Sequence, residues 1–296
     1  MNRKNAKILL IGGDLRQLTA ADELKRLGYT VSVCGFGTYA GAEYKDAIHL
    51  PDGTDAVLLP VPVFRGEYMN LPFSEERVTP ERLSGILRGH TRLVCGGMIP
   101  AELSGELEKS GAAVYDLCES DGFNIMNAVP TAEGAIALAI EKTPFTLWGS
   151  RVLVIGCGRA AVIGFGRVGK ALCRLLSAMG AHVTAVSRSE RDLAGSEACG
   201  YIPADHSALP GIAGEQDVIF NTVPHTVVTE EVLAAMKKDA PLIDLASRPG
   251  GVDTMAASRL GIRVISALSL PGKVAPVTAG KIIAKCLDKR LREAVL

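Results

Sequence analysis

The fold is decided by residues 151–188, which read RVLVIGCGRAAVIGFGRVGKALCRLLSAMGAHVTAVSR. An apolar, β-branched run leads into the turn Gly164–Gly169, helix-forming residues follow as far as Gly180, and a second apolar run ends at Arg188. This order predicts strand, turn, helix and strand. In a G-x-G-x-x-G turn the first glycine permits a sharp bend, the second lets the backbone approach a pyrophosphate, and the third lets the helix pack closely on its strand. Because a helix N-terminus attracts anions, the stretch predicts a dinucleotide site, with an ordinary strand-to-helix turn as the alternative.

The residues after the second predicted strand indicate which dinucleotide binds. NAD sites usually place Asp or Glu there to bind the ribose 2′-hydroxyl, whereas this chain has Ser187 and Arg188, which suit a 2′-phosphate. The nearest acid, Glu190, follows slightly late. The sequence therefore predicts NADP as the cofactor, with NAD less favoured. The predicted cofactor-binding residues are Gly164, Phe165, Gly166, Arg167, Val168, Gly169, Ser187, Arg188, Asn221, Thr222, Val223, Pro224, Leu245, Ala246 and Ser247.

The glycine turn is duplicated in tandem. Residues 154–161, VIGCGRAA, are followed at once by residues 162–169, VIGFGRVG. If the first copy led into the helix, that helix would carry three internal glycines, each costing up to about 1 kcal/mol relative to alanine. We therefore predict that the second copy leads into the helix, and that the first forms extra strand or an extruded loop.

Composition limits the function classes. The chain has 296 residues, of which 48% are hydrophobic and 22% charged, and this length predicts two globular domains. Lys plus Arg and Asp plus Glu both number 32, so no global basic field favours nucleic acid or an anionic membrane. No apolar run approaches the roughly 18 residues of a membrane helix, and residues 1–12 do not resemble a signal peptide. The seven cysteines form no CxxC pair, which predicts reduced core thiols in a cytoplasmic protein and no metal site.

Strands alternate with helices along the whole chain, which predicts an α/β protein with two Rossmann-like, doubly wound parallel-sheet domains and an interdomain cleft. Residues 61–79 are predicted to be an irregular loop, and residues 131–142 a connecting helix with Thr131 as its N-cap. The predicted divisions are a substrate domain at 1–122, a connecting helix and linker at 123–150, an NADP-binding domain at 151–274, and a C-terminal helix at 275–296 that packs back on the first domain.

Arg248 is the leading candidate for binding substrate. It follows a predicted strand, and a guanidinium presents paired donors that match a carboxylate. The alternative is a surface arginine that pairs with Asp244 or Asp253. The histidines at 206 and 225 are interpreted as loop residues rather than bases. The other candidate substrate residues are Lys273, Asp14, Arg16, Gln17, Asn127, Glu133 and Thr278, with a helix-capping Asp14 and a solvated Lys273 as alternatives.

The second predicted domain resembles the cofactor domain of D-2-hydroxyacid dehydrogenases. The shared features are the glycine turn, the proline loop at Val223-Pro224 and the arginine at 248. Those enzymes carry a catalytic histidine in a Pro-His motif before the last helix, where this chain has Pro276-Val277. The resemblance therefore identifies no general base, and the catalytic residues stay unassigned.

Nearly the whole chain resembles the A subunits of dipicolinate synthases from spore-forming bacteria. The motifs that carry this resemblance are residues 11–17 (IGGDLRQ), 127–135 (NAVPTAEGA), 247–251 (SRPGG) and 270–276 (LPGKVAP). The resemblance implies oxidation of dihydrodipicolinate, or of its hydroxy-tetrahydro precursor, to pyridine-2,6-dicarboxylate. It also implies a dicarboxylate substrate and a partner, a flavoprotein-like B subunit. The expected location is the mother-cell cytoplasm during sporulation. A homo-oligomer is a further possible assembly.

Two other functions stay open at this point. One is a different NAD(P)-dependent dehydrogenase of the hydroxyacid or alanine dehydrogenase type. The other is a non-catalytic NADP-binding subunit, which the missing histidine favours.

Overall fold

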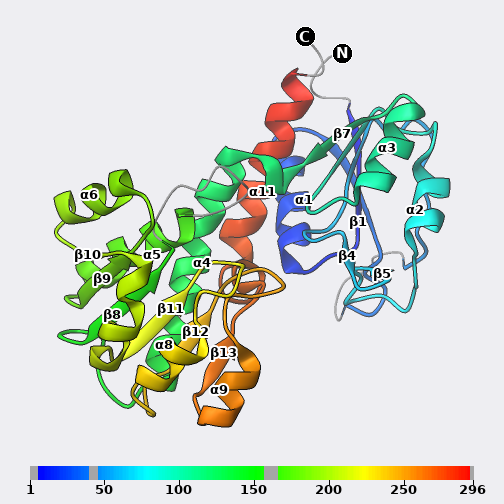
Figure 1. Cartoon of the computed structure of the whole chain (residues 1–296). Coiled ribbons are helices and arrows are strands. Elements are labelled where there is room, and N and C mark those ends of the chain that lie inside the picture. The colour runs from blue at the N-terminus through cyan, green and yellow to red at the C-terminus, as the bar shows by residue number, and fades with distance from the viewer. Residues whose placement is uncertain (1–5, 40–45, 157–165, 294–296) are drawn as a thin grey trace. The chain divides into compact units, whose positions relative to one another are not determined.

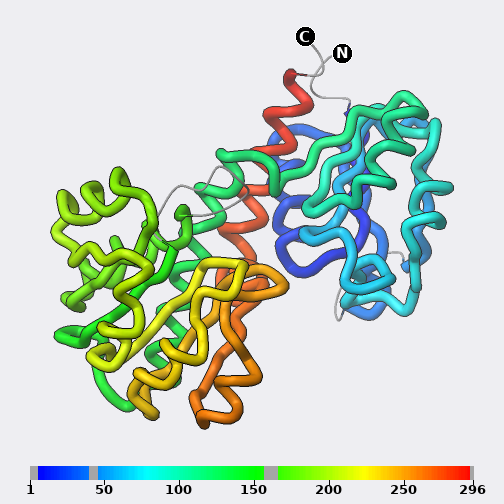
Figure 2. Tube along the Cα trace, viewed as in Figure 1, coloured from blue at the N-terminus to red at the C-terminus, as the bar shows by residue number. Residues whose placement is uncertain are grey.

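The computed structural model describes residues 6–39, 46–156 and 166–293 (Figure 1). The chain forms two compact units, one made of Met1–Asn124 with Ala275–Leu296 and the other of Ile125–Val274. The path of the chain is traced in Figure 2, where the C-terminal segment lies beside the N-terminal helix. The first unit is therefore built from both ends of the sequence.

The sheet of the first unit has a doubly wound order. Among the described residues, its five strands are parallel and lie in the order β2-β1-β3-β6-β7. Numbered within the unit, this is 2-1-3-4-5, a common doubly wound arrangement. The strands are β1 (Lys7–Ile11), β2 (Thr30–Cys34), β3 (Ala56–Leu58), β6 (Leu93–Gly96) and β7 (Ala113–Asp116).

Helices cover both faces of this sheet because successive side chains of each strand point to opposite faces. Ile8 and Leu10 of β1 pack towards α1 and α11, whereas Leu9 and Ile11 pack towards α2 and α3 (Figure 1). The helices are α1 (Leu15–Arg26), α2 (Pro80–Leu87), α3 (Ala101–Lys109), the 3₁₀ turn η2 (Leu117–Glu119) and α11 (Pro276–Glu293).

The sheet of the second unit has six parallel strands among the described residues, in the order β10-β9-β8-β11-β12-β13. Numbered within the unit this is 3-2-1-4-5-6, the order of dinucleotide-binding Rossmann folds. The strands are β8 (Arg151–Ile155), β9 (His182–Val186), β10 (Ile202–Ala204), β11 (Val218–Asn221), β12 (Leu242–Asp244) and β13 (Val264–Ser266). The α/β fold class with two Rossmann-like sheets is thereby confirmed.

Two apolar layers enclose the second sheet. Val152 and Val154 of β8 pack with α4 and α5, and Leu153 and Ile155 pack with α7, α8 and α9. The helices are α4 (Asp121–Lys142), α5 (Arg167–Ala178), α6 (Glu190–Ala198), η3 (His206–Ala208), α7 (Leu209–Ile212), η4 (Ala213–Glu215), α8 (Glu230–Ala235), α9 (Thr254–Leu260) and α10 (Leu270–Val274).

Helix α4 corrects one prediction. It begins at Asp121 rather than at Thr131, so Thr131 is not an N-cap. Pro130 lies inside the helix, where it removes one backbone donor. The Thr131 hydroxyl donates to the carbonyl of Asn127 at 2.8 Å, one turn earlier. Among the described residues α4 is the one helix long and apolar enough by composition to cross a membrane, but 44% of that window is buried within the structure, as in the core helix of a globular unit.

Two other parts of the chain differ from the prediction. Residues 61–79 are not wholly irregular, because β4 (Phe64–Arg65) and β5 (Tyr68–Met69) pair antiparallel around Gly66, whose φ is +68°. Helix α6 and strand β10 were not predicted. Strand β10 lies at the sheet edge with Ile202 and Pro203 exposed, so it lacks the apolar run that marks a buried strand.

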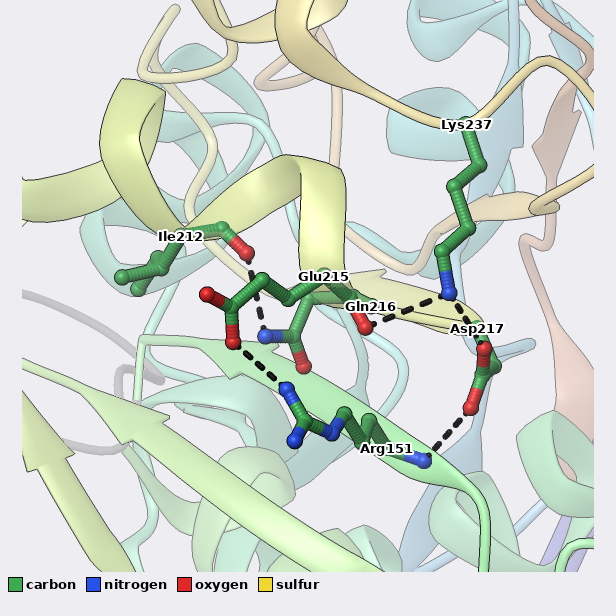
Figure 3. Close-up of polar contacts among 6 residues, drawn as sticks. All are labelled: Arg151, Ile212, Glu215, Gln216, Asp217 and Lys237. Atoms are coloured by element: carbon green, nitrogen blue, oxygen red, sulfur yellow. Dashed lines mark hydrogen bonds and ion pairs between the residues drawn. The ribbon is translucent and has the colours of Figure 1, made fainter.

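A charged network fixes the amino-terminal edge of the second sheet, opposite the edge where parallel strands bind ligands (Figure 3). The Arg151 guanidinium pairs with Glu215 at 2.6 Å, and the Arg151 backbone N–H donates to Asp217 at 2.8 Å. The Lys237 ammonium lies 2.6 Å from the other Asp217 oxygen. Burial raises the pKa of Asp217, but the hydrogen bonds from Lys237 and Arg151 outweigh burial and lower it overall.

Replacing Lys237 by methionine should destabilise this edge in a pH-dependent way. Because the pKa of Asp217 is lowered by folding, its contribution to stability is present above its unfolded pKa and is lost as pH falls through its folded pKa. We expect Lys237→Met to lower the free energy of unfolding by about 0.5–1 kcal/mol at pH 7, and by much less near about pH 2.5.

Urea denaturation at both pH values measures this effect. Lys238→Met is the matched control, since the Lys238 ammonium donates to the neutral carbonyl of Leu260 at 2.7 Å and its loss should not depend on pH. An equal loss at both pH values for Lys237→Met would show that Asp217 is not the partner that matters.

Candidate functional site

The carboxyl edge of the second sheet contains the candidate site. The strand order reverses between β8 and β11, and in open parallel sheets such a reversal is where ligands bind, beyond the carboxyl ends of the strands. Gly156 follows β8 with φ +99°, and its N–H donates to the Val186 carbonyl at 3.1 Å. A Cβ atom at Gly156 would lie 2.3 Å from the Thr222 hydroxyl oxygen. Glycine is therefore required where the chain leaves the strand.

The second copy of the repeat leads into the helix, as predicted, because α5 begins at Arg167 after Gly166. Gly166 has φ +86°, Gly169 is buried, and the first turn of α5 contains no acidic residue. The positive end of α5 is thus not neutralised by its own carboxylates, which suits an anion. The predicted residues Gly164 and Phe165 lie outside the described residues.

The two copies of the repeat supply different parts of this βα unit. The first copy supplies the end of β8 and Gly156, and the second supplies Gly166 and the start of α5. In a single G-x-G-x-x-G turn these two glycines would be two residues apart, whereas here they are ten apart (156 to 166). The excess of eight residues equals one repeat.

The loop after β9 presents a cation. The Ser187 hydroxyl accepts a hydrogen bond from the Ser189 N–H at 3.2 Å, and Ser187 is buried. Arg188 is exposed and forms no ion pair with a described carboxylate. Its Nη2 lies 2.8 Å from Nε2 of His225, which follows β11. The structure thus brings together residues from two loops that are far apart in sequence.

His206 joins this group from the loop after β10. Burial lowers the pKa of His206, Arg188 and His225 lower it further, and Asp205 acts in the opposite direction. Sequence reasoning did not assign either histidine to the site. The signal for both would have been the strand order, because β10, β9, β8 and β11 are neighbours and their loops share one edge.

Asn221 and Asp244 lock the loops after β11 and β12. The fully buried Asn221 amide donates to Asp244 at 2.8 Å and to the Val223 carbonyl at 3.0 Å, and it accepts from the Val223 N–H at 3.1 Å. The other Asp244 oxygen accepts from the Gly251 N–H at 3.4 Å. The Thr222 hydroxyl donates to the Ile155 carbonyl at 3.0 Å. Of the predicted cofactor residues, Asn221 and Thr222 therefore shape the loops through protein contacts, and Val223, Pro224, Leu245, Ala246 and Ser247 lie on those loops.

Arg248 lies in the loop that Asp244 anchors. It is exposed and makes no hydrogen bond or ion pair within the described ranges, 6–39, 46–156 and 166–293. Neither alternative partner pairs with it, since Asp244 binds Asn221 and the Asp253 carboxylate caps α9 by accepting from the Ala256 N–H at 2.9 Å. The guanidinium is therefore available to an external anion.

The other candidate substrate-binding residues of the second unit are held by fewer contacts. Lys273 is exposed on α10, Glu133 is exposed on α4, and Asn127 is half-buried on α4. None of these side chains makes a hydrogen bond to a described residue, so their geometry does not distinguish a binding role from a solvated one.

In the first unit, Asp14 holds Arg16. The Asp14 carboxylate accepts from Nε and Nη2 of Arg16, both at 2.8 Å, and it also caps α1 through the Arg16 N–H at 3.1 Å. Arg16 is only 5% exposed and donates a further hydrogen bond to the Val61 carbonyl. Gln17 is 2% exposed, and its Oε1 has no hydrogen-bond partner among the described residues. Thr278 is exposed on α11.

The donors at the β1–α1 turn are used within the chain. The N–H of Gly12 donates to the Cys34 carbonyl and that of Gly13 to the Asn70 carbonyl, both at 2.9 Å. A Cβ at Gly12 would lie 2.0 Å from a Leu71 methyl carbon. These two N–H groups are thus already paired within the chain and do not offer themselves to a pyrophosphate.

Among the described residues, the geometry indicates neither a disulfide nor a metal centre. The cysteines at 34, 95, 118, 173, 199 and 286 form no disulfides. Burial raises the pKa of the Cys34 and Cys118 thiols to about 12, which suppresses the reactive thiolate. In the part of the chain that the structure describes, no group of three or more His, Cys, Asp or Glu residues is placed to hold a metal ion.

Comparison with known families agrees with this architecture. Residues 7–118 match the N-terminal domain of the dipicolinate synthase A subunits. Residues 140–258 match the NAD-binding domain of D-isomer-specific 2-hydroxyacid dehydrogenases. The second unit therefore contains a nicotinamide dinucleotide-binding dehydrogenase domain, and the chain is an NAD(P)-dependent oxidoreductase.

Individual relatives extend the match over the whole chain. The A subunit of dipicolinate synthase from Bacillus subtilis is 34% identical over 293 residues, which cover 97% of this chain and 96% of that protein. The solved structure of the same subunit from Bacillus halodurans covers 97% of both chains with a TM-score of 0.83 at 34% identity. The Bacillus subtilis structure gives a TM-score of 0.82 at 33% identity and covers 97% of this chain and 96% of that one. The chain therefore belongs to the family of dipicolinate synthase A subunits.

Proposed function

We propose that this chain is the A subunit of a dipicolinate synthase and oxidises dihydrodipicolinate, or its hydroxy-tetrahydro precursor, to pyridine-2,6-dicarboxylate with NADP. The observation that carries the proposal is Arg248, an exposed guanidinium with no described partner at the ligand-binding edge of a dehydrogenase domain. A dicarboxylate substrate needs such a cation, because a guanidinium binds a carboxylate through two parallel hydrogen bonds. The identity along the whole chain to a protein of that name supports the same substrate.

The cofactor is assigned to the carboxyl edge of the second sheet. The pyrophosphate would lie at the N-terminus of α5, where Gly166 and Gly169 admit a close approach and no acid opposes it. The 2′-phosphate would bind Arg188 and Ser187 after β9. When bound, NADP supplies a hydride acceptor. The protein's own contribution is to orient the ring through its carboxylates and to hold it against the acceptor, while aromatisation drives the loss of hydride and proton from the dihydro ring. The hydroxy-tetrahydro precursor must also lose one water to reach the same product.

The assembly follows from the family resemblance. We assign substrate binding to residues 1–122 and NADP binding to residues 151–274. Residues 275–296 are assigned to the first domain. The proposed partner is a B subunit, in the mother-cell cytoplasm of a sporulating bacterium.

A non-catalytic, NADP-binding role is the second candidate. It is favoured because α11 begins with Pro276 and an exposed Val277 where related dehydrogenases carry a histidine. Reconstitution with a catalytically inactive B subunit separates the two roles. Product formation would assign the chemistry to this chain, and its absence would assign the chemistry to the B subunit.

NADPH should bind more tightly than NADH, and Arg188 should account for the difference. Removing the guanidinium deletes a charge-assisted contact to the 2′-phosphate, so we expect Arg188→Ala to weaken NADPH binding about tenfold or more and to leave NADH binding nearly unchanged. Nicotinamide fluorescence titration measures both affinities. Arg191→Ala, an exposed arginine three residues later, is the control. Tighter binding of NADH than NADPH by the unmodified chain would refute the cofactor assignment.

Arg248 should determine the affinity for substrate. With the B subunit present, we expect Arg248→Ala to raise the KM for the dicarboxylate about 10- to 100-fold, because a charge-assisted hydrogen-bond pair is lost, and Arg248→Lys to recover part of it. Steady-state dipicolinate formation is the readout, and unchanged NADPH affinity reports that the variant is folded. Arg259→Ala, which removes an exposed ion pair with Glu230, should have no effect. A normal KM for Arg248→Ala would exclude it as the carboxylate ligand.

Removing one repeat should preserve the cofactor site. Deletion of residues 157–164 joins Gly156 to Phe165 and restores one uninterrupted VIGFGRVG turn between β8 and α5. Since the end of the strand and the start of the helix are each retained, we expect the shortened chain to bind NADPH at least as tightly as the full chain in the same fluorescence titration. Loss of binding would mean that the duplicated segment itself belongs to the site.

A further inference from the structure

Arg188, His206 and His225 form a basic cluster at the carboxyl edge of the second sheet. They follow three different strands, β9, β10 and β11, so the fold and not local sequence brings them together. Nη2 of Arg188 lies 2.8 Å from Nε2 of His225. His206 is half-buried, and its burial and the charge of Arg188 lower its pKa.

The Arg188–His225 contact determines the role of one imidazole nitrogen. A guanidinium is a donor only and is always charged, so Nε2 of His225 must be the acceptor in this hydrogen bond. In this hydrogen bond the imidazole therefore presents an unprotonated Nε2 to the guanidinium. The guanidinium of Arg188 thus donates to an imidazole nitrogen. A carboxylate or phosphate oxygen could accept the same hydrogen bond.

One described carboxylate, that of Asp205, opposes the positive charge near His206. Among the described groups that shift His206, Asp205 is the one carboxylate, and burial, Arg188 and His225 together outweigh it and lower the pKa of His206. The Asp205 carboxylate accepts from the backbone N–H of Ser207 at 2.9 Å and from its hydroxyl at 2.8 Å. The cluster therefore places the acceptor nitrogen of His225 and a histidine of lowered pKa, His206, beside a fixed cation, so a proton can be taken up when an anion arrives.

We propose that the basic cluster is a proton-linked phosphate site, in which the 2′-phosphate dianion of NADP replaces His225 as the acceptor of Arg188 and is bound together with a proton taken up by His225 or His206. This inference rests on the NADP assignment above, and it makes the affinity of the same site for NADP depend on pH. A protonated imidazole donates from both ring nitrogens, so it can bind the phosphate oxygens that a neutral acceptor nitrogen repels.

The sign of the pH dependence follows from this exchange. A bound dianion favours the charged imidazolium, so the complex holds more protons than the free protein and affinity rises as pH falls. The rise in affinity ends at about pH 6, where the phosphate monoester itself is protonated. NADH has no 2′-phosphate, so its affinity should not follow this pattern.

Fluorescence titrations with NADPH and NADH at pH 6.5 and 8.5 test the inference. Uptake of one proton changes affinity by up to tenfold per pH unit, so we expect NADPH to bind at least about fivefold more tightly at pH 6.5, and NADH to bind equally at both within about twofold. A double substitution, His206→Gln with His225→Gln, should remove most of the pH dependence. His182→Gln is the matched control, because His182 lies at the opposite end of β9.

A calorimetric measurement on the unmodified chain makes the test independent of the variants. Titration with NADPH at pH 7.5 in two buffers of different ionisation enthalpy should show net proton uptake, and titration with NADH should show about none. Tight but pH-independent NADPH binding, or a pH dependence that survives the double substitution, would overturn the proton linkage and leave the NADP assignment intact. Failure of NADPH to bind in preference to NADH at any pH would overturn both.

Discussion

The site depends on one constraint, which is that parallel strands place all their carboxyl ends at the same edge of a sheet. Strands β9, β8, β11 and β12 are neighbours, so the loops that follow them converge although they lie between residues 156 and 253 of the sequence. The reversal of strand order between β8 and β11 keeps this edge open. The buried Asn221–Asp244 hydrogen bond then holds two of the loops in register, because leaving either group unpaired in the core would cost about 1–3 kcal/mol.

The two units use the same βα turn differently. In the first unit, the N–H groups of Gly12 and Gly13 already donate to the carbonyls of Cys34 and Asn70, and Asp14 occupies the helix N-terminus. In the second unit, α5 begins after Gly166 with no acid in its first turn. A helix N-terminus binds an external anion only where its donors and its dipole are not already satisfied. This contrast assigns the nucleotide to the second unit, in agreement with the dehydrogenase domain found at residues 140–258.

Sequence reasoning predicted the fold where burial leaves a local signal and failed where it does not. Core strands such as β8 are continuous apolar runs and were predicted from that signal, whereas the edge strand β10 carries exposed Ile202 and Pro203 and was missed. The connecting helix was predicted to begin at Thr131, but α4 begins at Asp121 and continues through Pro130 despite the local preference of proline. The sequence could supply candidates for the site, because glycines and strand ends are visible in it. It could not supply the Arg188–His225 contact, since that contact depends on how two distant loops meet.

The central claim is that the carboxyl edge of the second sheet binds NADP, with its phosphates at α5 and Arg188. An experimental structure of the chain with bound NADP tests this most directly. The account predicts the pyrophosphate at the N-terminus of α5 and the 2′-phosphate within hydrogen-bond distance of the Arg188 guanidinium, with His225 released from its present contact. A nucleotide bound elsewhere, or a 2′-phosphate directed into solvent with the Arg188–His225 contact unchanged, would contradict it.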